Sequence, residues 1–163
     1  SSIMHRPGRL RFDDLNYVHG YKPWPVYGQS KLAMLMFGLE LDRRSRSNGW
    51  GLTSVTAHPG YARTALIGNG PLGRRPVVRA VMQLVFRPFI EPFISHSAAD
   101  GALPILMAAT DPKIRPGAFV GPQGAKEMKG PPGPAKAEPH ALDEAAAARL
   151  FDDTEATLGV RFA

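Results

Sequence analysis

A tyrosine and a lysine four residues apart are the side chains best placed to do chemistry in this sequence. They open and close the segment Tyr27-Gly-Gln-Ser-Lys31. In a helix, two residues at this spacing lie on the same face, one turn apart. A phenol ordinarily keeps its proton up to about pH 10, and a nearby ammonium favours the phenolate and lowers that pKa. Such a pair can exchange a proton near neutral pH, as carbonyl reduction and alcohol oxidation require.

The same spacing is also typical of an ordinary surface helix, because lysine is common, so the elements around the pair decide its meaning. Apolar residues recur at helical spacing and predict a helix over residues 27–47. They are Leu32, Leu35, Met36 and Leu39. Asn48-Gly49 predicts the end of this helix. The arginines of residues 43–46 fall in its last turn, where positive charge is favourable, which explains them better than a binding patch.

A strand and a proline-glycine turn are predicted after this helix. Residues 52–57 are rich in β-branched side chains and are bounded by Gly51 and Pro59-Gly60, which is typical of a strand. A helix, a short turn and a strand in succession indicate an α/β protein with a parallel sheet. Residues 58–64 then leave the carboxyl end of the strand, the edge at which open parallel sheets bind ligands.

The rest of the chain is expected to add helices and one short strand. Residues 76–86 predict an amphipathic helix that covers a pocket or packs in the core, and its few basic residues disfavour a membrane surface. Ser95 is expected to cap a helix that runs to residue 109. Its inward-facing residues are expected to be Ala98, Ala102, Leu103, Leu106 and Met107. A short buried strand or turn over 117–121, a surface loop over 121–140 and a helix over 142–158 complete the prediction.

The composition limits the classes of protein to consider. A chain of 163 residues suits one domain with its own core. It has no cysteine, which fits a reducing compartment, so a cytoplasmic location is expected. No apolar run is long enough for a transmembrane segment, and Asp13-Asp14 has no histidine or cysteine nearby to complete a metal site. The net charge is +6, but the arginines are scattered without interleaved aromatics, so no nucleic acid is expected as a partner.

Six motifs in a fixed order carry a resemblance to a known family. They are Ser1-Ser2 with His5 and Gly8, Phe12-Asp-Asp-Leu-Asn16, Tyr27-Gly-Gln-Ser-Lys-Leu-Ala33, Val55-Thr-Ala-His-Pro-Gly60 with Thr64, Ala108-Ala-Thr-Asp-Pro112, and Phe119-Val-Gly-Pro122. The chain resembles the C-terminal half of a short-chain dehydrogenase/reductase. Within that family it is similar to the branch of retinol dehydrogenases, WW-domain oxidoreductase and light-dependent protochlorophyllide reductase. The resemblance covers nearly the whole chain and implies an α/β fold, the C-terminal part of a Rossmann-like doubly wound parallel sheet.

The resemblance implies catalytic roles for three residues. Tyr27 would be the acid/base that exchanges a proton with the substrate oxygen. Lys31 would lower the pKa of Tyr27 and hydrogen-bond the nicotinamide ribose. Ser2 would hydrogen-bond the substrate carbonyl or hydroxyl and hold it beside Tyr27.

It also implies where the cofactor and the substrate would lie. The cofactor would be NAD or NADP. The backbone at Pro59 and Gly60 would approach the nicotinamide, and Thr64 would bind its carboxamide or the phosphates. The apolar segment 65–94 would bind the substrate, which is then expected to be a lipophilic alcohol, aldehyde or ketone.

The first half of the family's fold has no counterpart in this sequence. A dinucleotide needs a glycine-rich turn after the first strand, so that its pyrophosphate can lie at a helix N-terminus. Gly68-Asn-Gly70-Pro-Leu-Gly73 has a similar spacing, but it follows no predicted strand and contains a proline. The chain also begins Ser1-Ser2 without a preceding strand. We therefore expect residues 1–163 to form a single partial domain with uncovered helix faces and an open sheet edge.

Within this partial domain the sequence predicts four segments. They are an irregular lead-in (1–26), a catalytic-type helix and strand (27–64), a substrate-binding-type segment (65–94), and C-terminal helices with a last short strand (95–163).

Three functions remain open from the sequence. The first is a truncated dehydrogenase/reductase that is inactive alone. The second is a non-catalytic interaction module that docks through its uncovered sheet edge on a complementing chain or on a second copy. The third is a basic binder of nucleic acid or a membrane surface, which only the net charge supports.

Overall fold

The computed structural model describes residues 1–62 and 80–162. Its first half contains η1 (Ile3–His5), α1 (Pro23–Asn48), β1 (Thr56–Ala57), η3 (Met82–Ile90) and α4 (Glu91–Ile94). Its second half contains α5 (Ala98–Thr110), β2 (Phe119–Pro122), η4 (Ala125–Glu127), β3 (Pro132–Pro134), η5 (Pro139–Leu142) and α6 (Glu144–Leu158). Thr64 and residues 65–79, the first half of the predicted substrate-binding segment, lie outside the described residues.

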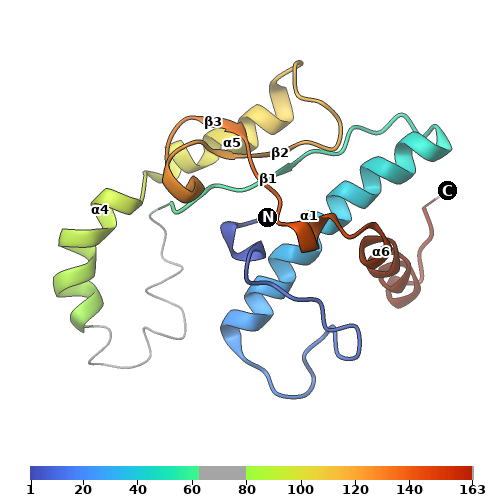
Figure 1. Ribbon diagram of the computed structural model, residues 1–163, viewed down its shortest axis with the longest axis horizontal. Helices are drawn as coiled ribbons and strands as arrows, with labels where there is room; N and C mark the ends of the chain where they lie inside the picture. Colours follow the sequence, from blue (N-terminus) through green and yellow to red (C-terminus); the bar gives the residue numbers. More distant parts are fainter. Residues whose placement is uncertain (63–79, 163) are drawn as a thin grey trace.

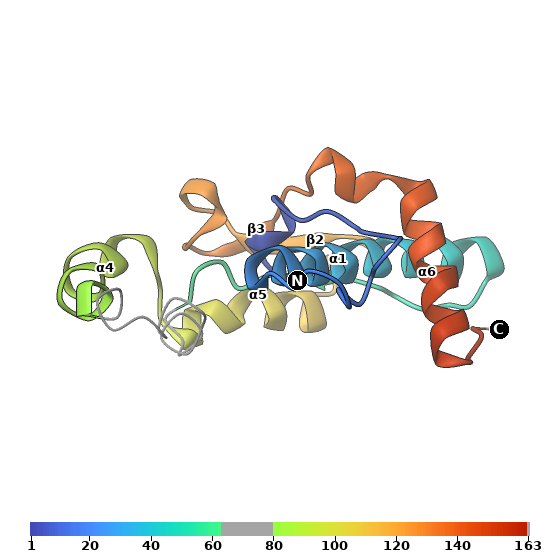
Figure 2. The same ribbon diagram turned by 90° about the horizontal axis from the view of Figure 1, so that it is seen from below.

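The three described strands form one mixed sheet in the order β1-β2-β3. β1 pairs parallel with β2, with Thr56 opposite Phe119, and β2 pairs antiparallel with β3. α1 and α5 pack on opposite sides of this sheet, and α6 packs across α1 (Figures 1 and 2). The α/β class expected from the sequence is confirmed, with an antiparallel strand added to the parallel pair.

Two strand predictions need correction. The strand expected over residues 52–57 is regular only at Thr56–Ala57, where Thr56 pairs with Phe119 at the start of β2. Before this pair, the Ser54 carbonyl still accepts from the Gly117 amide at 2.8 Å. The segment expected to be a surface loop over 121–140 contains β3. Two of its three residues are prolines, which lack an N–H, but an edge strand tolerates proline because one side of its backbone needs no partner.

The helix that carries the tyrosine–lysine pair starts earlier than predicted. α1 begins at Pro23 rather than residue 27, so Pro23 and Pro25 lie in its first turn. The first N–H groups of a helix have no partner within the helix, so prolines cost little there. The predicted end is confirmed, because Gly49 follows the helix in the left-handed region with φ 67°.

The apolar stripe of α1 forms the core with β2 and α6. Leu32, Leu35 and Met36 are at most 2% exposed, and they cluster with Phe119 and Leu150. Leu39 is only partly buried against the same cluster. The core therefore lies on the face of the sheet that α1 covers, as the helical spacing of the stripe predicts.

The face of α5 that packs on the sheet differs from the prediction. Gly101 and Pro104 are buried, whereas Leu103 and Leu106 are 40% and 54% exposed. The helix runs so close to the end of β1 that a Cβ at Gly101 would lie 2.8 Å from the Cβ of Ala62. Small size rather than hydrophobicity selects the inward residues here. The N-cap of α5 is Ser97 rather than the expected Ser95. The Ser97 hydroxyl accepts a hydrogen bond from the Asp100 amide at 3.0 Å.

The helical segment formed by η3 and α4 projects from the body of the molecule (Figure 1), and we call residues 82–94 the apolar arm. It extends eight residues beyond the predicted end at residue 86. Leu84, Phe89 and Phe93 are 68–75% exposed, so these side chains do not pack in the core. Across the part of the chain that the structure describes, no helix has both the length and the apolar character needed to cross a membrane.

A buried carboxylate organises the basic end of α1. Glu40 is 2% exposed. Its Oε1 accepts from Arg43 Nη2 and Arg44 Nε, both at 2.6 Å. Arg44 continues to Asp152 of α6 at 2.7 Å. Burial alone would raise the pKa of the Glu40 carboxyl, but the two arginines outweigh it and hold the pKa below its ordinary value.

The Glu40 cluster predicts a loss of stability in acid. From about pH 5 downward the unfolded chain binds a proton at Glu40 more readily than the folded chain, so the free energy of unfolding falls. Urea unfolding at about pH 6 and about pH 3 should show that the free energy of unfolding falls more for the native chain than for Glu40→Gln when the pH is lowered. Glu144→Gln, at an exposed position, is the control and should keep the native loss. Equal losses in the native chain and Glu40→Gln would contradict the role of this carboxylate.

Candidate functional site

The predicted pair lies together on the N-terminal part of α1. The Lys31 ammonium lies 5.3 Å from the centre of the Tyr27 ring, which also meets the edge of Trp24 at 6.4 Å. Both side chains of the pair are half-buried. Lys31 Nζ contacts Met34 Sδ at 3.8 Å, and within residues 1–62 and 80–162 no carboxylate forms an ion pair with it. The ammonium is therefore available to a ligand hydroxyl beside the phenol.

The first two residues tie this helix turn to the end of β1. The Ser1 hydroxyl donates to the Lys31 carbonyl at 2.7 Å, and the Ser1 nitrogen donates to the Ala57 carbonyl at 2.8 Å. Ser2 is 8% exposed, and its Oγ accepts from the Met4 amide at 3.2 Å as the N-cap of η1. A hydroxyl that accepts one hydrogen bond still has its own proton to donate. The structure thus places the Ser2 segment against the Tyr27–Lys31 turn.

A glycine allows this close approach. An added Cβ at Gly28 would lie 3.3 Å from both the Met4 carbonyl and the Gly8 Cα. These atoms belong to the segment that follows Ser2. The absence of a side chain at Gly28, next to Tyr27, lets that segment rest directly on α1.

The Pro59–Gly60 turn is fixed by histidines on both sides. The Gly60 amide donates to Nδ1 of His58 at 3.1 Å, and the Pro59 carbonyl accepts from Nε2 of His96 at 2.6 Å. Gly60 has φ 68°, and a Cβ there would collide with the Met128 carbonyl and lie 2.8 Å from Pro122 Cγ. Glycine is therefore required at position 60 by packing against residues 127–128, independently of any ligand.

A buried polar cluster that the sequence analysis missed lies beneath this turn. The Glu127 carboxylate accepts from Arg6 Nη2 at 2.8 Å and from His58 Nε2 at 3.1 Å. Burial lowers the pKa of His58 to about 4, although Glu127 acts in the opposite direction. Arg6 and Glu127 are 121 positions apart, so no local pattern could have revealed their contact.

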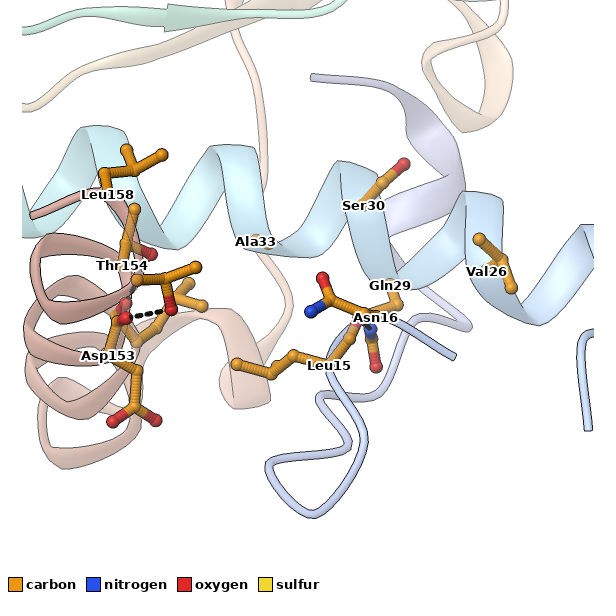
Figure 3. Close-up of a pocket in the computed structure, with 11 residues that line it drawn as sticks. Leu15, Asn16, Val26, Gln29, Ser30, Ala33, Asp153, Thr154 and Leu158 are labelled. Carbon is orange, nitrogen blue, oxygen red and sulfur yellow. Dashed lines mark hydrogen bonds between the residues drawn. The ribbon is translucent and has the colours of Figure 1, made fainter. Parts of the chain in front are cut away.

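A separate hollow lies on another side of α1 (Figure 3). It measures about 360 Å³ and lies between the loop at Leu15, α1 and α6. Gln29 anchors the loop, because its side chain accepts from the Arg11 amide and donates to the Leu15 carbonyl, both at 2.8 Å. Neither Tyr27 nor Lys31 lines this hollow, so it is not part of the site on the tyrosine–lysine face.

Comparisons with known proteins agree with the geometry. No family model matches the chain. It is 30% identical to retinol dehydrogenase 14 of Mus musculus over 164 residues, which cover 98% of this chain and 43% of that protein. It is 33% identical to polyprenol dehydrogenase of Mus musculus over 113 residues, which cover 69% of this chain and 31% of that protein.

A solved structure of an uncharacterised protein from Mycobacterium paratuberculosis is also similar. It matches with a TM-score of 0.67 and 31% identity, over 100% of this chain and 50% of that one. The chain belongs to the short-chain dehydrogenase/reductase family. It corresponds to a C-terminal portion of such proteins and spans about 43% of the length of retinol dehydrogenase 14.

The residues present fit one end of the NAD(P) cofactor that this family uses. Lys31 offers an ammonium without a carboxylate partner among the described residues, 5.3 Å from the centre of the Tyr27 ring. This donor set suits the hydroxyl groups of a ribose and the oxygen of a substrate. The pyrophosphate end would need a glycine-rich turn between a strand and a helix, and the described part of this short-chain dehydrogenase/reductase holds none.

The environment of Gly60 predicts a specific cost for adding one methyl group. Gly60→Ala should be destabilising by more than Gly49→Ala, although φ is 68° and 67° at the two positions. Both variants place an alanine in the left-handed region, at about 1 kcal/mol each. Only Gly60→Ala adds a collision, because nothing lies within 4 Å of a Cβ at Gly49. Urea unfolding measures the difference, and equal losses would contradict the packing against Met128.

Proposed function

We propose that the chain supplies the proton-handling part of an NAD(P)-dependent oxidoreductase that interconverts lipophilic alcohols with aldehydes or ketones. The observation that carries the proposal is the Tyr27–Lys31 pair, held by Ser1 against the carboxyl end of β1. Family membership supports the class of reaction. Thr64, which lies outside the described residues, keeps its proposed role at the nicotinamide carboxamide or the phosphates.

Each residue of the pair has a defined task in this proposal. In reduction the Tyr27 hydroxyl donates its proton to the substrate oxygen, and in oxidation the phenolate accepts it back. The Lys31 ammonium stabilises the negative charge on the phenolate and hydrogen-bonds the ribose. The Ser2 hydroxyl donates to the same substrate oxygen and orients it. A bound nicotinamide would supply or accept the hydride, and the backbone at Pro59–Gly60 would hold its ring.

Two observations support a lipophilic substrate. The relatives are named for retinol and polyprenol. In this chain, Leu84, Phe89 and Phe93 of the apolar arm are 68–75% exposed, and the arm projects from the body of the molecule (Figure 1). Burying such side chains against a hydrocarbon removes apolar surface from water, which is favourable. We assign the arm to the cover of the substrate chain.

The proposal predicts that Tyr27 is essential in a complete enzyme. A chimera in which this chain replaces the aligned half of the Mycobacterium paratuberculosis protein would be assayed with NADH, NADPH and all-trans-retinal. Tyr27→Phe should lower kcat by about 10²- to 10⁴-fold, because it removes the acid/base. Tyr21→Phe, at a side chain 66% exposed, is the matched control and should keep full activity. The 163-residue chain alone should show no turnover, and an active Tyr27→Phe chimera would refute the assignment.

A second candidate function is docking of a complementing chain on the outer edge of β1. The Thr56 and His58 amides donate to the carbonyls of Ala118 and Val120, both at 2.9 Å. Successive backbone groups of a strand alternate in direction, so the Ala57 N–H points away from β2. The Ala57 carbonyl on that side accepts from Ser1. Because the chain spans 43% of its relative, a strand from the uncovered portion of a family member is the occupant that we propose.

Amide hydrogen exchange tests this docking. In the chain alone the Ala57 amide should exchange fast, whereas the Thr56 and His58 amides should be protected by β2. Adding the uncovered half of the Mycobacterium paratuberculosis protein should protect Ala57 and leave the other two unchanged. Protection that depends only on the concentration of this chain would identify a second copy as the occupant. Fast exchange of Ala57 under every condition would exclude docking at this edge.

A further inference from the structure

The Glu127 carboxylate lies outside the Tyr27–Lys31 pair and connects three other segments of the chain through hydrogen bonds. Its Oε2 accepts from Arg6 Nη2 at 2.8 Å and from His58 Nε2 at 3.1 Å. Its Oε1 accepts from the Lys136 amide at 2.9 Å. The side chain is 16% exposed. A partly buried carboxylate that accepts three hydrogen bonds is well compensated for its loss of water.

The backbone that carries this carboxylate has an uncommon conformation. Lys126 and Glu127 have φ 53° and 57°. Residues with a Cβ rarely adopt this region, and such residues cluster where the surrounding structure requires a particular geometry. Arg6 Nη1 donates to the Lys126 carbonyl at 2.9 Å. The left-handed pair thus turns both the Glu127 side chain and a backbone acceptor toward the segment of Ser2.

The hydrogen bonds assign the tautomer of His58. A neutral imidazole has one N–H donor and one bare acceptor nitrogen. Nδ1 accepts from the Gly60 amide at 3.1 Å, so it is bare, and Nε2 carries the proton that it donates to Glu127. His58 is completely buried beside the ring of Phe119, 5.1 Å away. Burial lowers its pKa to about 4, which keeps the ring neutral at pH 7.

We propose that Glu127 and His58 are positioning residues for the Pro59–Gly60 turn. The carboxylate fixes the Nε2–H tautomer, and the bare Nδ1 then holds the Gly60 amide in one orientation. Through Arg6, four residues after Ser2, the same carboxylate links this turn to the serine segment. The link to catalysis rests on the proposed function, which sets the turn against the nicotinamide. We call the hydrogen bonds from Glu127 through His58 to the Gly60 amide the relay, and this relay is a property of this chain.

The first test measures the tautomer in the 163-residue chain labelled with ¹⁵N. Long-range ¹H–¹⁵N spectra at pH 7 should show His58 with a protonated Nε2 and a bare Nδ1. A hydrogen-bond coupling should connect the Gly60 amide to Nδ1. An imidazolium or an Nδ1–H tautomer at pH 7 would overturn the proposal without any variant.

Two substitutions separate the two halves of the relay. In His58→Asn the side-chain oxygen can take the place of Nδ1 and accept from Gly60, whereas in His58→Gln the amide nitrogen can take the place of Nε2 and reach Glu127. Exchange of the Gly60 amide should be about five- to tenfold faster in His58→Gln than in His58→Asn, because one hydrogen bond is lost. His19→Gln, at an exposed histidine, should match the native chain. Equal exchange in the two His58 variants would overturn the positioning role.

The chimera distinguishes failure of this inference from failure of the proposed function. His58→Gln should raise KM for the nicotinamide cofactor by about tenfold, the equivalent of one hydrogen bond to the turn, and His58→Asn should restore it. If the native chain shows the relay and His58→Gln leaves the KM of the chimera unchanged, the link between the turn and the cofactor is overturned. A missing relay in an enzyme that still depends on Tyr27 would overturn this inference alone.

Discussion

The contact between the backbone of α1 and the segment of Ser2 is the constraint on which the site depends. Gly28 leaves no side chain between them, so the Met4 carbonyl lies 3.3 Å from the place where a Cβ would stand. Ser1 then bonds both the Lys31 carbonyl and the Ala57 carbonyl. One close approach therefore brings a helix turn, a serine segment and a strand end into a single unit. The acid/base proposed for this member of the short-chain dehydrogenase/reductase family is placed by that unit.

Two carboxylates, the buried Glu40 and the partly buried Glu127, connect separate segments elsewhere in the molecule. Glu40 gathers Arg43 and Arg44 at the end of α1, and Arg44 extends the cluster to α6. Glu127 gathers Arg6 and His58 beneath the Pro59–Gly60 turn. An isolated buried carboxylate would be costly, so each is stable only with its partners in place. Only Arg46 lies in the last turn of α1, so the predicted place of Arg43 and Arg44 in that turn is wrong, and their charge is paired with Glu40 instead.

The fold was predictable where a local pattern records it. Helical spacing and Asn48-Gly49 give the core stripe and the end of α1, because periodicity and capping act within a few residues. The pattern failed for β3, since two of its three residues are prolines and only the neighbouring β2 makes the segment a strand. It also failed for α5, where proximity to β1 buries Gly101 and Pro104 and leaves larger apolar residues exposed.

The candidate site likewise has one part that the sequence predicts and another that only the tertiary structure shows. The sequence by itself determined that Tyr27 and Lys31 share a helix face, because a spacing of four residues fixes their relation within one element. It also carried the motifs by which the family is identified. Only the tertiary structure decided that Glu127 holds His58, across 69 positions of sequence, and thereby which nitrogen of His58 faces the Gly60 amide. Such contacts form when separate segments pack, and a one-dimensional pattern contains no record of which segments will meet.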